Sequence, residues 1–176
     1  MSKIFCFGYG YCCDYLGHVL GAQGSWEIRG TTRDPEKQAI LNSRDVKAFL
    51  FDDDSPLCDP MNALEDITHI LISTPPDDAG DPVFLSHADD ILNLKSLEWV
   101  GYLSTTGVYG DRAGGWVEEG AEISPSSKRG SRRAKAEAQW LDLYQNHDLP
   151  VHIFRLSGIY GPGRSALDSV RAGVAR

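Results

Sequence analysis

The sequence predicts an α/β protein built on a doubly wound parallel sheet of the Rossmann type, with about six strands. Two observations predict this fold: short apolar segments alternate with helix-like segments along the chain, and the first apolar segment runs straight into a glycine-rich turn. Strands that are apolar along their length are typical of parallel sheets covered by helices on both faces. Right-handed crossovers then place ligands at the carboxyl ends of the strands.

The first half of the chain is expected to form three strands and two helices. Residues 3–7 are apolar and end at a glycine turn, and residues 15–22 carry apolar side chains at helical spacing. Asp34 followed by Pro35 is typical of a helix N-cap with proline at the first helical position. The predicted strands are residues 3–7, 26–31 and 46–51, and the predicted helices are residues 15–22 and 35–42.

The second half is expected to form three more strands and two longer helices. Pro75 and Pro76 end the strand at residues 69–73, and Pro150 precedes the last strand. Apolar residues at helical spacing predict a buried stripe on the last helix, made of Ala134, Ala138, Leu141 and Tyr144. The predicted strands are residues 69–73, 99–104 and 151–156, and the predicted helices are residues 84–97 and 129–147.

Length and charge indicate one domain over residues 1–176 and exclude several classes of function. The 176 residues carry 25 acidic and 17 basic side chains, a net charge of −8, which argues against a general binder of nucleic acid or anionic membranes. No apolar run approaches the roughly 18–20 residues that cross a bilayer. We therefore expect a cytoplasmic protein. The spacing of four cysteines and five histidines predicts neither a disulfide framework nor a metal site.

The turn after the first strand is the candidate nucleotide-binding motif. It reads Gly8-Tyr9-Gly10-Tyr11-Cys12-Cys13 and stands between a strand and a helix. Gly8 permits a tight turn, and Gly10 lets the backbone approach a pyrophosphate at the helix N-terminus. Cys13 replaces the third glycine of such fingerprints. The predicted cofactor-binding residues of this turn are Gly8, Gly10, Tyr11, Cys12 and Cys13.

The end of the second strand favours NADP over NAD. A residue that reads the adenosine ribose is expected about 20 positions after the glycine turn, where the sequence reads Thr31-Thr32-Arg33. Hydroxyls and a guanidinium suit a 2′-phosphate better than a 2′-hydroxyl. NAD stays open as the alternative, because Arg33 can equally be solvated beside a helix cap at Asp34.

Four further segments, together with the glycine turn, carry a family resemblance. They are residues 103–111 (LSTTGVYGD), 155–164 (RLSGIYGPGR), 73–77 (STPPD) with Gly80-Asp81-Pro82, and 115–119 (GWVEE). In their order along the chain they resemble the extended short-chain dehydrogenase/reductase superfamily. More narrowly, they resemble an atypical, nucleoside-diphosphate-sugar epimerase-like branch of the NAD-dependent epimerase/dehydratase family.

The resemblance implies a catalytic site that is incomplete in this sequence. It implies that Thr105 hydrogen-bonds a substrate oxygen and that Ser73 and Thr74 contact the cofactor. The family's Tyr-x-x-x-Lys pair matches Ser131 and Lys135, so the lysine, which would also contact the cofactor, is present and the tyrosine is absent. A serine hydroxyl does not replace a phenol whose pKa is near 10. The substitutes are Tyr109, Tyr160, or a water held by Ser131 and Lys135.

A basic patch lies at the start of the last helix, at Lys128, Arg129, Arg132, Arg133 and Lys135. No aromatic side chains are interleaved with it, so nucleic acid is not the expected partner. Either it is a solvated helix face, or it binds phosphates of a dinucleotide or nucleotide-sugar, with Arg155 and Arg164 as additional clamps.

The predicted function is hydride transfer by an NAD(P)-binding protein on a small polar or nucleotide-sugar substrate. The alternative is a non-catalytic NADP(H)-binding sensor or partner-binding module that has lost the tyrosine. A methyltransferase-like domain is a third reading that the glycine turn alone permits. The resemblance also implies a homodimer. It implies too that residues 157–176 begin a truncated substrate-binding region, with the substrate lobe largely missing.

Overall fold

The computed structural model describes residues 1–174 and contains one sheet of six parallel strands. The strand order is β3-β2-β1-β4-β5-β6, so the direction of winding reverses between β1 and β4. In sheets of this kind, ligands bind outside the carboxyl ends of the strands at that reversal. The predicted Rossmann-type fold class is therefore confirmed. The strands are β1 (Ser2–Phe7), β2 (Trp26–Thr32), β3 (Val46–Leu50), β4 (His69–Ile72), β5 (Trp99–Thr105) and β6 (Val151–Leu156).

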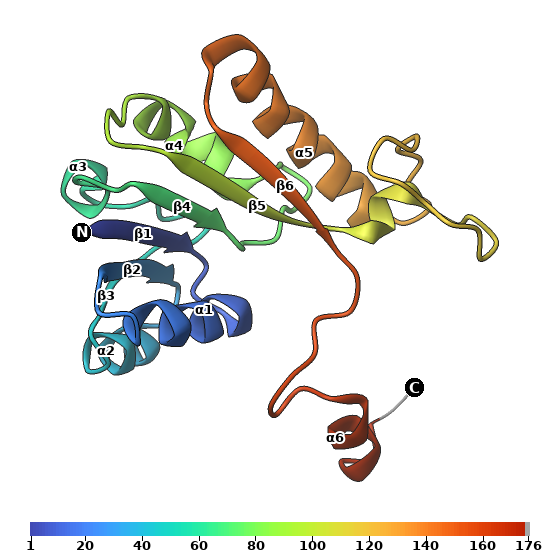
Figure 1. Cartoon of the computed structure of the whole chain (residues 1–176), viewed down its shortest axis with the longest axis horizontal. Helices are drawn as coiled ribbons and strands as arrows, with labels where there is room; N and C mark the ends of the chain where they lie inside the picture. Colours follow the sequence, from blue (N-terminus) through green and yellow to red (C-terminus); the bar gives the residue numbers. More distant parts are fainter. Residues whose placement is uncertain (175–176) are drawn as a thin grey trace.

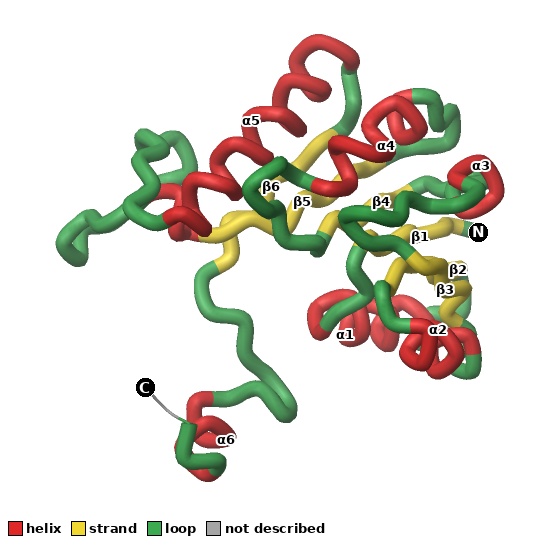
Figure 2. The backbone as a smooth tube through the Cα atoms, turned by 180° about the vertical axis from the view of Figure 1, so that it is seen from behind, coloured by secondary structure: helices red, strands yellow, loops and turns green. Residues whose placement is uncertain are grey.

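Helices cover both faces of the sheet, each face over a different set of strands. Figure 1 shows α1 and α2 on one side of the sheet near β1–β3, and α4 and α5 on the other side near β4–β6; Figure 2 shows the same division from behind. The helices are α1 (Tyr11–Gly21), α2 (Pro35–Asn42), α3 (Pro60–Ala63), α4 (Pro82–Leu92), the 3₁₀ helix η1 (Thr106–Tyr109), α5 (Lys128–His147) and α6 (Ala166–Arg171).

Aspartate caps followed by proline fix three helix starts. Asp34, Asp59 and Asp81 each accept hydrogen bonds from backbone N–H groups of the first turn, at α2, α3 and α4. The predicted helix at residues 84–97 therefore begins two residues earlier, and it ends at Leu92 with Asn93 as its C-cap. The predicted helix at 15–22 likewise begins at Tyr11, because Gly10 is the N-cap of α1.

Two apolar cores lie on opposite faces of the sheet. Successive side chains of β1 point to opposite faces, so Phe5 and Phe7 join one core while Ile4 and Cys6 join the other. The α4–α5 side packs Val83, Ile91, Ala136, Trp140 and Leu143 on the sheet, and the α1–α2 side packs Cys13, Leu20 and Leu41. Each large side chain buried in this way contributes about 1.5–3 kcal/mol.

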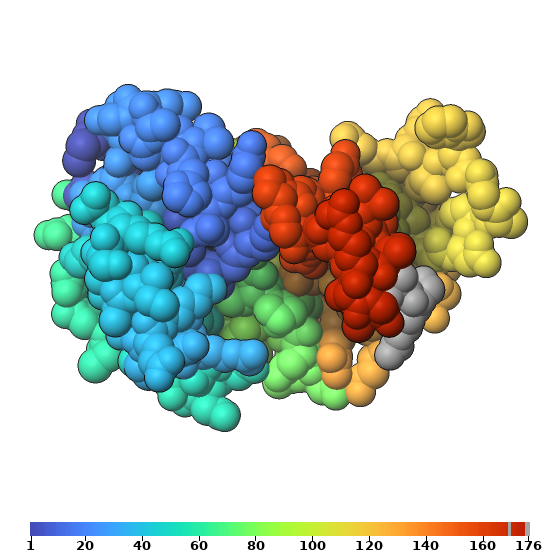
Figure 3. All heavy atoms as spheres, turned by 90° about the horizontal axis from the view of Figure 1, so that it is seen from below, coloured from blue at the N-terminus to red at the C-terminus, as the bar shows by residue number. Residues whose placement is uncertain are grey.

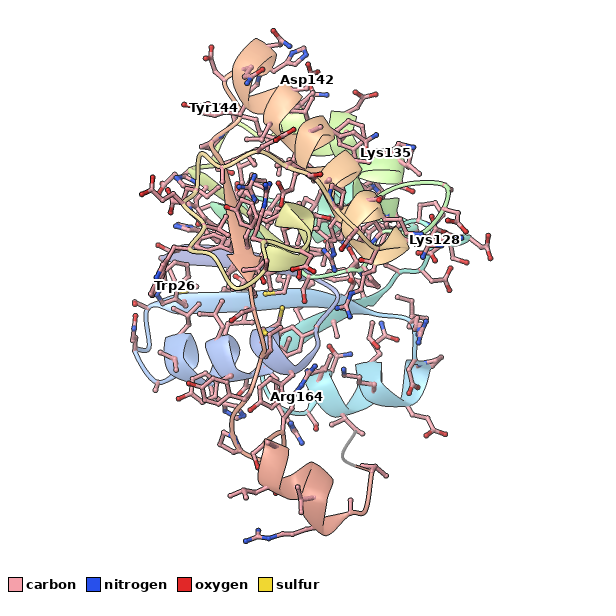
Figure 4. All side chains as sticks on the ribbon, turned by 90° about the vertical axis from the view of Figure 1, so that its right-hand side faces the viewer. Trp26, Lys128, Lys135, Asp142, Tyr144 and Arg164 are labelled. Atoms are coloured by element: carbon pink, nitrogen blue, oxygen red, sulfur yellow. The ribbon has the colours of Figure 1, made fainter. Side chains whose placement is uncertain are left out.

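The predicted buried stripe of α5 is wrong. Ala138 and Tyr144 are exposed, with Tyr144 53% accessible and visible at the far end of the helix in Figure 4. The buried face is instead Arg133, Ala136, Glu137, Trp140 and Leu143. Two of these residues are charged and are buried with polar partners. A pattern of apolar residues alone therefore assigned the wrong face.

The chain after β6 returns to the N-terminus of α1. The Tyr11 hydroxyl donates to the Pro162 carbonyl at 3.2 Å, and the Arg164 guanidinium lies 5.5 Å from the centre of the Tyr11 ring. Figure 3 shows this C-terminal segment between the α1 side of the molecule and the loop after η1. Residues 175 and 176, the end of the predicted 157–176 region, lie outside the described residues. No helix within residues 1–174 is long and apolar enough to cross a membrane.

Candidate functional site

The β1–α1 turn has the geometry that close approach of a ligand requires. Gly8 has φ +80°, and a Cβ there would lie 2.9 Å from Thr74 Cγ2, so this position requires glycine. The Gly8 N–H donates to Thr31 Oγ1 at 2.8 Å, which fixes the turn against β2. Gly10 caps α1 without any side-chain hydrogen bond. The first backbone N–H groups of α1 are therefore left for an anionic ligand.

A first cavity of about 340 Å³ opens between this turn and the ends of β2 and β3. Arg33 is exposed at its wall, and Lys37 Nζ donates to the Tyr9 carbonyl at 2.7 Å. Asp34 caps α2, as the sequence allowed, and does not line the cavity. The lining residues are Gly8, Tyr9, Gly10, Thr31, Thr32, Arg33, Lys37, Phe51, Asp52, Asp53, Ser73, Thr74 and Pro75.

The acidic loop after β3 contributes Asp52 and Asp53 to the wall of this cavity. Burial raises the pKa of Asp53, with further increases from Asp77 and Asp52, and Arg33 opposes them. The sequence showed these acidic residues, but it could not show that β3 ends beside Arg33. The first cavity therefore combines hydroxyls, a guanidinium and carboxylates.

A second cavity of about 300 Å³ lies at the ends of β4, β5 and β6. It shares Gly10, Ser73 and Pro75 with the first cavity. The two cavities therefore adjoin at the carboxyl edge of the sheet, and we call them together the edge groove. The second cavity is lined by Gly10, Tyr11, Cys12, Ser73, Pro75, Leu103, Ser104, Thr105, Arg129, Arg133, Leu156, Ser157, Ile159 and Arg164.

Two buried hydroxyls of the edge groove have no hydrogen-bond partner within residues 1–174. They are Thr74 Oγ1 in the first cavity and Ser104 Oγ in the second. Buried polar atoms in native proteins are almost always satisfied, so a partner from outside the chain, a water molecule or a ligand, is expected for both. A polar ligand in the groove would supply it.

Ser131 and Lys135 lie on the solvent side of α5. The Ser131 hydroxyl donates to the Ser127 carbonyl at 3.1 Å, and both residues are exposed. Figure 4 shows Lys135 extending outward from the helix, well separated from Arg164. Neither residue lines the second cavity, whereas Thr105 does.

The side chains that α5 brings to the second cavity are Arg129 and Arg133. They stand four residues apart and share one face of the helix. They therefore repeat the Tyr-x-x-x-Lys spacing two residues before the predicted pair. The sequence contained this signal within the basic patch, but the apolar pattern did not identify which face of α5 points to the sheet.

Tyr109 lies outside the lining of both cavities. Its hydroxyl accepts from Arg155 Nη1 at 2.7 Å, and the Arg155 guanidinium lies 4.9 Å from the centre of its ring. Arg155 also pairs with the fully buried Glu137, which raises the pKa of the guanidinium. Arg155 is therefore occupied by the fold and is not a free phosphate clamp. Tyr160 is 84% exposed and lines neither cavity.

Of the predicted cysteines, Cys12 lines the second cavity and Cys13 belongs to the core under α1. Burial raises the pKa of the Cys12 thiol. Cys13 is fully buried at the position of the third glycine, where α1 packs on β1. No group of three His, Cys, Asp or Glu side chains among residues 1–174 is placed to hold a metal ion.

Fold and edge groove together define a Rossmann-type α/β protein with a groove at its topological switch point. No family model and no curated protein matches the sequence. Solved structures do match, among them a conserved protein of unknown function from Silicibacter pomeroyi DSS, with 40% identity, a TM-score of 0.83, and coverage of 97% of this chain and 57% of that one.

Two solved enzyme structures share the fold at lower identity. The UDP-glucuronic acid 4-epimerase of Bacillus cereus with NAD has 20% identity, a TM-score of 0.71, and coverage of 90% of this chain and 57% of that one. The dTDP-glucose 4,6-dehydratase of Bacillus anthracis str. Ames with NAD has 16% identity, a TM-score of 0.75, and coverage of 98% and 62%. The chain spans about three fifths of the length of these three proteins.

Proposed function

We propose that the edge groove binds a nicotinamide dinucleotide, with the adenosine half in the first cavity and the nicotinamide half in the second. The observation that carries this proposal is that the two cavities share Gly10, Ser73 and Pro75 in their walls at the β1–β4 switch point. The uncapped N-terminus of α1 lies between them, where a pyrophosphate would meet backbone N–H groups. The solved enzymes of this fold named above hold NAD.

We further propose that NADP is preferred. Arg33 is exposed at the wall of the first cavity, beside the buried Thr31 and Thr32. A guanidinium binds a phosphate monoester through two parallel hydrogen bonds, which a ribose hydroxyl does not offer. Asp53 opposes this preference, because its charge interacts with Arg33.

The proposed chemistry is hydride transfer to or from a small polar or nucleotide-sugar substrate in the second cavity. The bound nicotinamide would supply the hydride chemistry. Thr105 would hydrogen-bond a substrate oxygen, since its hydroxyl lies at the cavity wall and already accepts from the Gly107 N–H at 3.1 Å. UDP-glucuronic acid and dTDP-glucose are the first substrates to test, because enzymes of this fold act on them.

A second candidate function, binding of the dinucleotide without turnover, is favoured by the side chains of α5. Arg129 and Arg133 occupy the cavity wall, and a guanidinium stays protonated at neutral pH, so it neither takes up nor releases the proton that a tyrosine–lysine pair would move. Under this alternative the protein is a sensor of the dinucleotide or a partner-binding module.

Fluorescence titration with NADPH and NADH tests the shared part of both functions. Saturable binding is expected, and absence of binding by either dinucleotide at millimolar concentration would contradict the proposal. Turnover assays with UDP-glucuronic acid and dTDP-glucose then separate the two functions. A rate that Thr105→Ala abolishes, while leaving NADPH binding unchanged, supports hydride transfer; binding without a rate supports the alternative.

We also propose a homodimer that uses the outward face of α5. Ala138 and Tyr144, which the sequence grouped in one apolar stripe, are exposed on this helix rather than packed on the sheet. Light scattering on the eluted protein is expected to give twice the chain mass. Tyr144→Glu should shift it to the monomer mass, and Ile40→Glu, at an exposed apolar residue of α2 on the other side of the sheet, should not.

A further inference from the structure

We propose that Arg129 and Arg133 form a binding site for an oxyanion of the substrate, a carboxylate or a phosphate group, at the β5–β6 end of the edge groove. The inference rests on the proposed function for the position of the dinucleotide. It adds the chemical class of the substrate. It also gives a role to two arginines that stand where a proton-transferring pair was expected.

Ion pairs distinguish two pairs of residues among the first four cations of the basic patch. Lys128 and Arg132 both bind Asp78, with Lys128 Nζ 2.8 Å from Oδ2 and Arg132 Nη2 2.6 Å from Oδ1. Arg129 and Arg133 form no ion pair within residues 1–174. Two cations on the cavity side of the helix therefore lack the counter-charge that their neighbours have.

Arg133 is held in place at the cavity wall by neutral groups. Its Nη1 donates to the Leu103 carbonyl at 2.6 Å and to the Tyr102 hydroxyl at 3.2 Å, and its guanidinium lies 5.5 Å from the centre of the Tyr102 ring. Only 8% of the residue is exposed. Its charge lowers the pKa of Asp81, yet no ion pair forms between them. A guanidinium buried to this degree normally has an anionic partner.

The remaining donors of Arg133 are available to a ligand. No hydrogen bond from its Nε or Nη2 forms within residues 1–174. Arg129 lies one turn earlier on the same face, exposed and lining the same cavity. Two guanidinium groups on one helix face can each donate parallel hydrogen bonds to an oxyanion. The ammonium group of a lysine acts as a point charge and does not offer this geometry.

Ser104 supplies the second, independent sign of a ligand. Its Oγ is buried at the wall of the same cavity and has no partner within the described chain, and the residue is only 6% exposed. A hydroxyl is a donor that suits an anionic oxygen as well as a neutral one. Two arginines and one orphaned hydroxyl therefore converge on one region from α5 and β5.

The phosphates of the dinucleotide would meet a different side of the second cavity. The N-terminus of α1 and Arg164, which lies over the Tyr11 ring, line that cavity from the α1 side. Arg129 and Arg133 come from α5, beyond β5. An oxyanion held there belongs to the molecule that shares the second cavity with the nicotinamide.

Nuclear magnetic resonance titration of the dinucleotide-free protein tests the site directly. The probes are inorganic phosphate and glycolate, and the signals are the Arg133 Nε–Hε group and the Ser104 amide. Saturable shifts with one or both probes are expected, and comparing the probes distinguishes a phosphate from a carboxylate. Absence of saturable shifts with both probes overturns the proposal.

Matched variants separate this site from its neighbours. Arg129→Ala should weaken binding of the effective probe about tenfold, as loss of a charged hydrogen-bond donor does, and Arg132→Ala should change it less than about twofold. Equal effects of both variants overturn the proposal. If Arg133→Ala fails to fold, Arg133→Lys is the variant to use, because it keeps the positive charge. It should still weaken binding, because lysine lacks the paired N–H donors of the guanidinium group.

Titration with NADPH distinguishes the substrate's anion from the cofactor's. Arg129→Ala should leave NADPH affinity within about twofold of the wild type. If it weakens NADPH as strongly as it weakens the probe, the arginines bind the dinucleotide's phosphates and the proposal is wrong. Binding of the probe by a protein that binds no NADPH would refute the proposed function and leave the oxyanion site standing.

Discussion

At the scale of single residues, Arg33 is the side chain that should distinguish the two nicotinamide dinucleotides. It is exposed at the wall of the first cavity, where a 2′-phosphate would add two charge-assisted hydrogen bonds. Arg33→Ala should weaken NADPH binding about tenfold, or ~1.4 kcal/mol, and NADH binding less than about twofold. Fluorescence titration measures both, with Arg44→Ala as the control, since Arg44 is an exposed arginine outside the edge groove. An equal loss for both dinucleotides would contradict the preference for NADP.

Asp81 should make the stability of the protein depend on pH. Burial raises the pKa of this carboxyl above 3.8, while the backbone N–H groups that it caps at the start of α4 oppose the increase. The folded state then holds the proton after the unfolded state has lost it, so stability falls as pH rises from about 3.8 through the folded-state pKa. Asp81→Asn keeps a capping oxygen and does not ionise.

The free energy of unfolding by urea, measured from pH 3 to pH 8 for both proteins, checks this prediction. The stability of the wild type relative to Asp81→Asn should decline across that range. A difference that stays constant would mean that the buried carboxyl keeps its ordinary pKa, and one that grows with pH would mean that its pKa is lowered; either result contradicts the prediction.

The position of a single residue was predictable from the sequence where it depends only on neighbouring elements along the chain. Gly8 and Gly10 follow β1, while Thr31 and Thr32 end β2 and Arg33 follows it, so their position at the groove follows from strand–turn–helix order alone. Arg129 and Arg133 were not distinguished from Ser131 and Lys135, because that choice depends on how α5 is rotated about its axis. The rotation is set by buried Glu137 and Arg133, and their partners Arg155 and Leu103 belong to other elements.

At the scale of elements, the packing of α1 on β2 depends on the close contact between the Tyr9 side chain and Gly17. The Tyr9 side chain is buried, and a Cβ at Gly17 would overlap its hydroxyl, while the next ring atom would be 3.3 Å away. Gly17→Ala should therefore cost about 1–3 kcal/mol, as overpacking of a core does.

Tyr9→Phe removes the overlapping atom and supplies the test. The double variant Tyr9→Phe with Gly17→Ala should recover most of the loss, and it gains about 1 kcal/mol of helix propensity at position 17. Urea denaturation of the wild type, both single variants and the double variant gives the coupling energy. Additive effects of the two changes would mean that the contact does not set the distance between α1 and β2.

Most elements were predictable because their signals are local and agree with one another. No strand end differs from the predicted one by more than one residue, and Asp34-Pro35 marks the start of α2 correctly. The short elements α3, η1 and α6 were missed, since four to six residues carry too little periodicity to be recognised. The α5 stripe failed because two charged residues belong to the buried face.

At the scale of the whole molecule, the doubly wound parallel sheet was predictable from the alternation of strands and helices, but the second cavity was not. Its wall combines the ends of three strands, one face of α5 and the returning segment around Ile159 and Arg164. Residues this distant in sequence meet only through tertiary packing, which no local pattern reports.

The ion pair between Glu137 and Arg155 joins the parts of that wall. Glu137 is fully buried on α5, and Arg155 of β6 donates to it from Nε and Nη2, the latter at 2.8 Å. The same guanidinium donates from Nη1 to the Tyr109 hydroxyl at 2.7 Å and to the Glu119 carbonyl at 2.9 Å. One arginine thus connects α5, β6, η1 and the loop that follows.

Removing one partner of this pair should therefore destabilise the whole fold. Glu137→Leu leaves Arg155 mostly buried without its counter-charge, which costs about 3–5 kcal/mol in comparable pairs. Adding Arg155→Met removes that charge and should recover part of the loss, although Tyr109 and the Glu119 carbonyl lose a donor. Urea denaturation of the four proteins measures the coupling. A cost of Glu137→Leu below about 1 kcal/mol would mean that water reaches the pair, and that the wall of the second cavity is held by apolar packing alone.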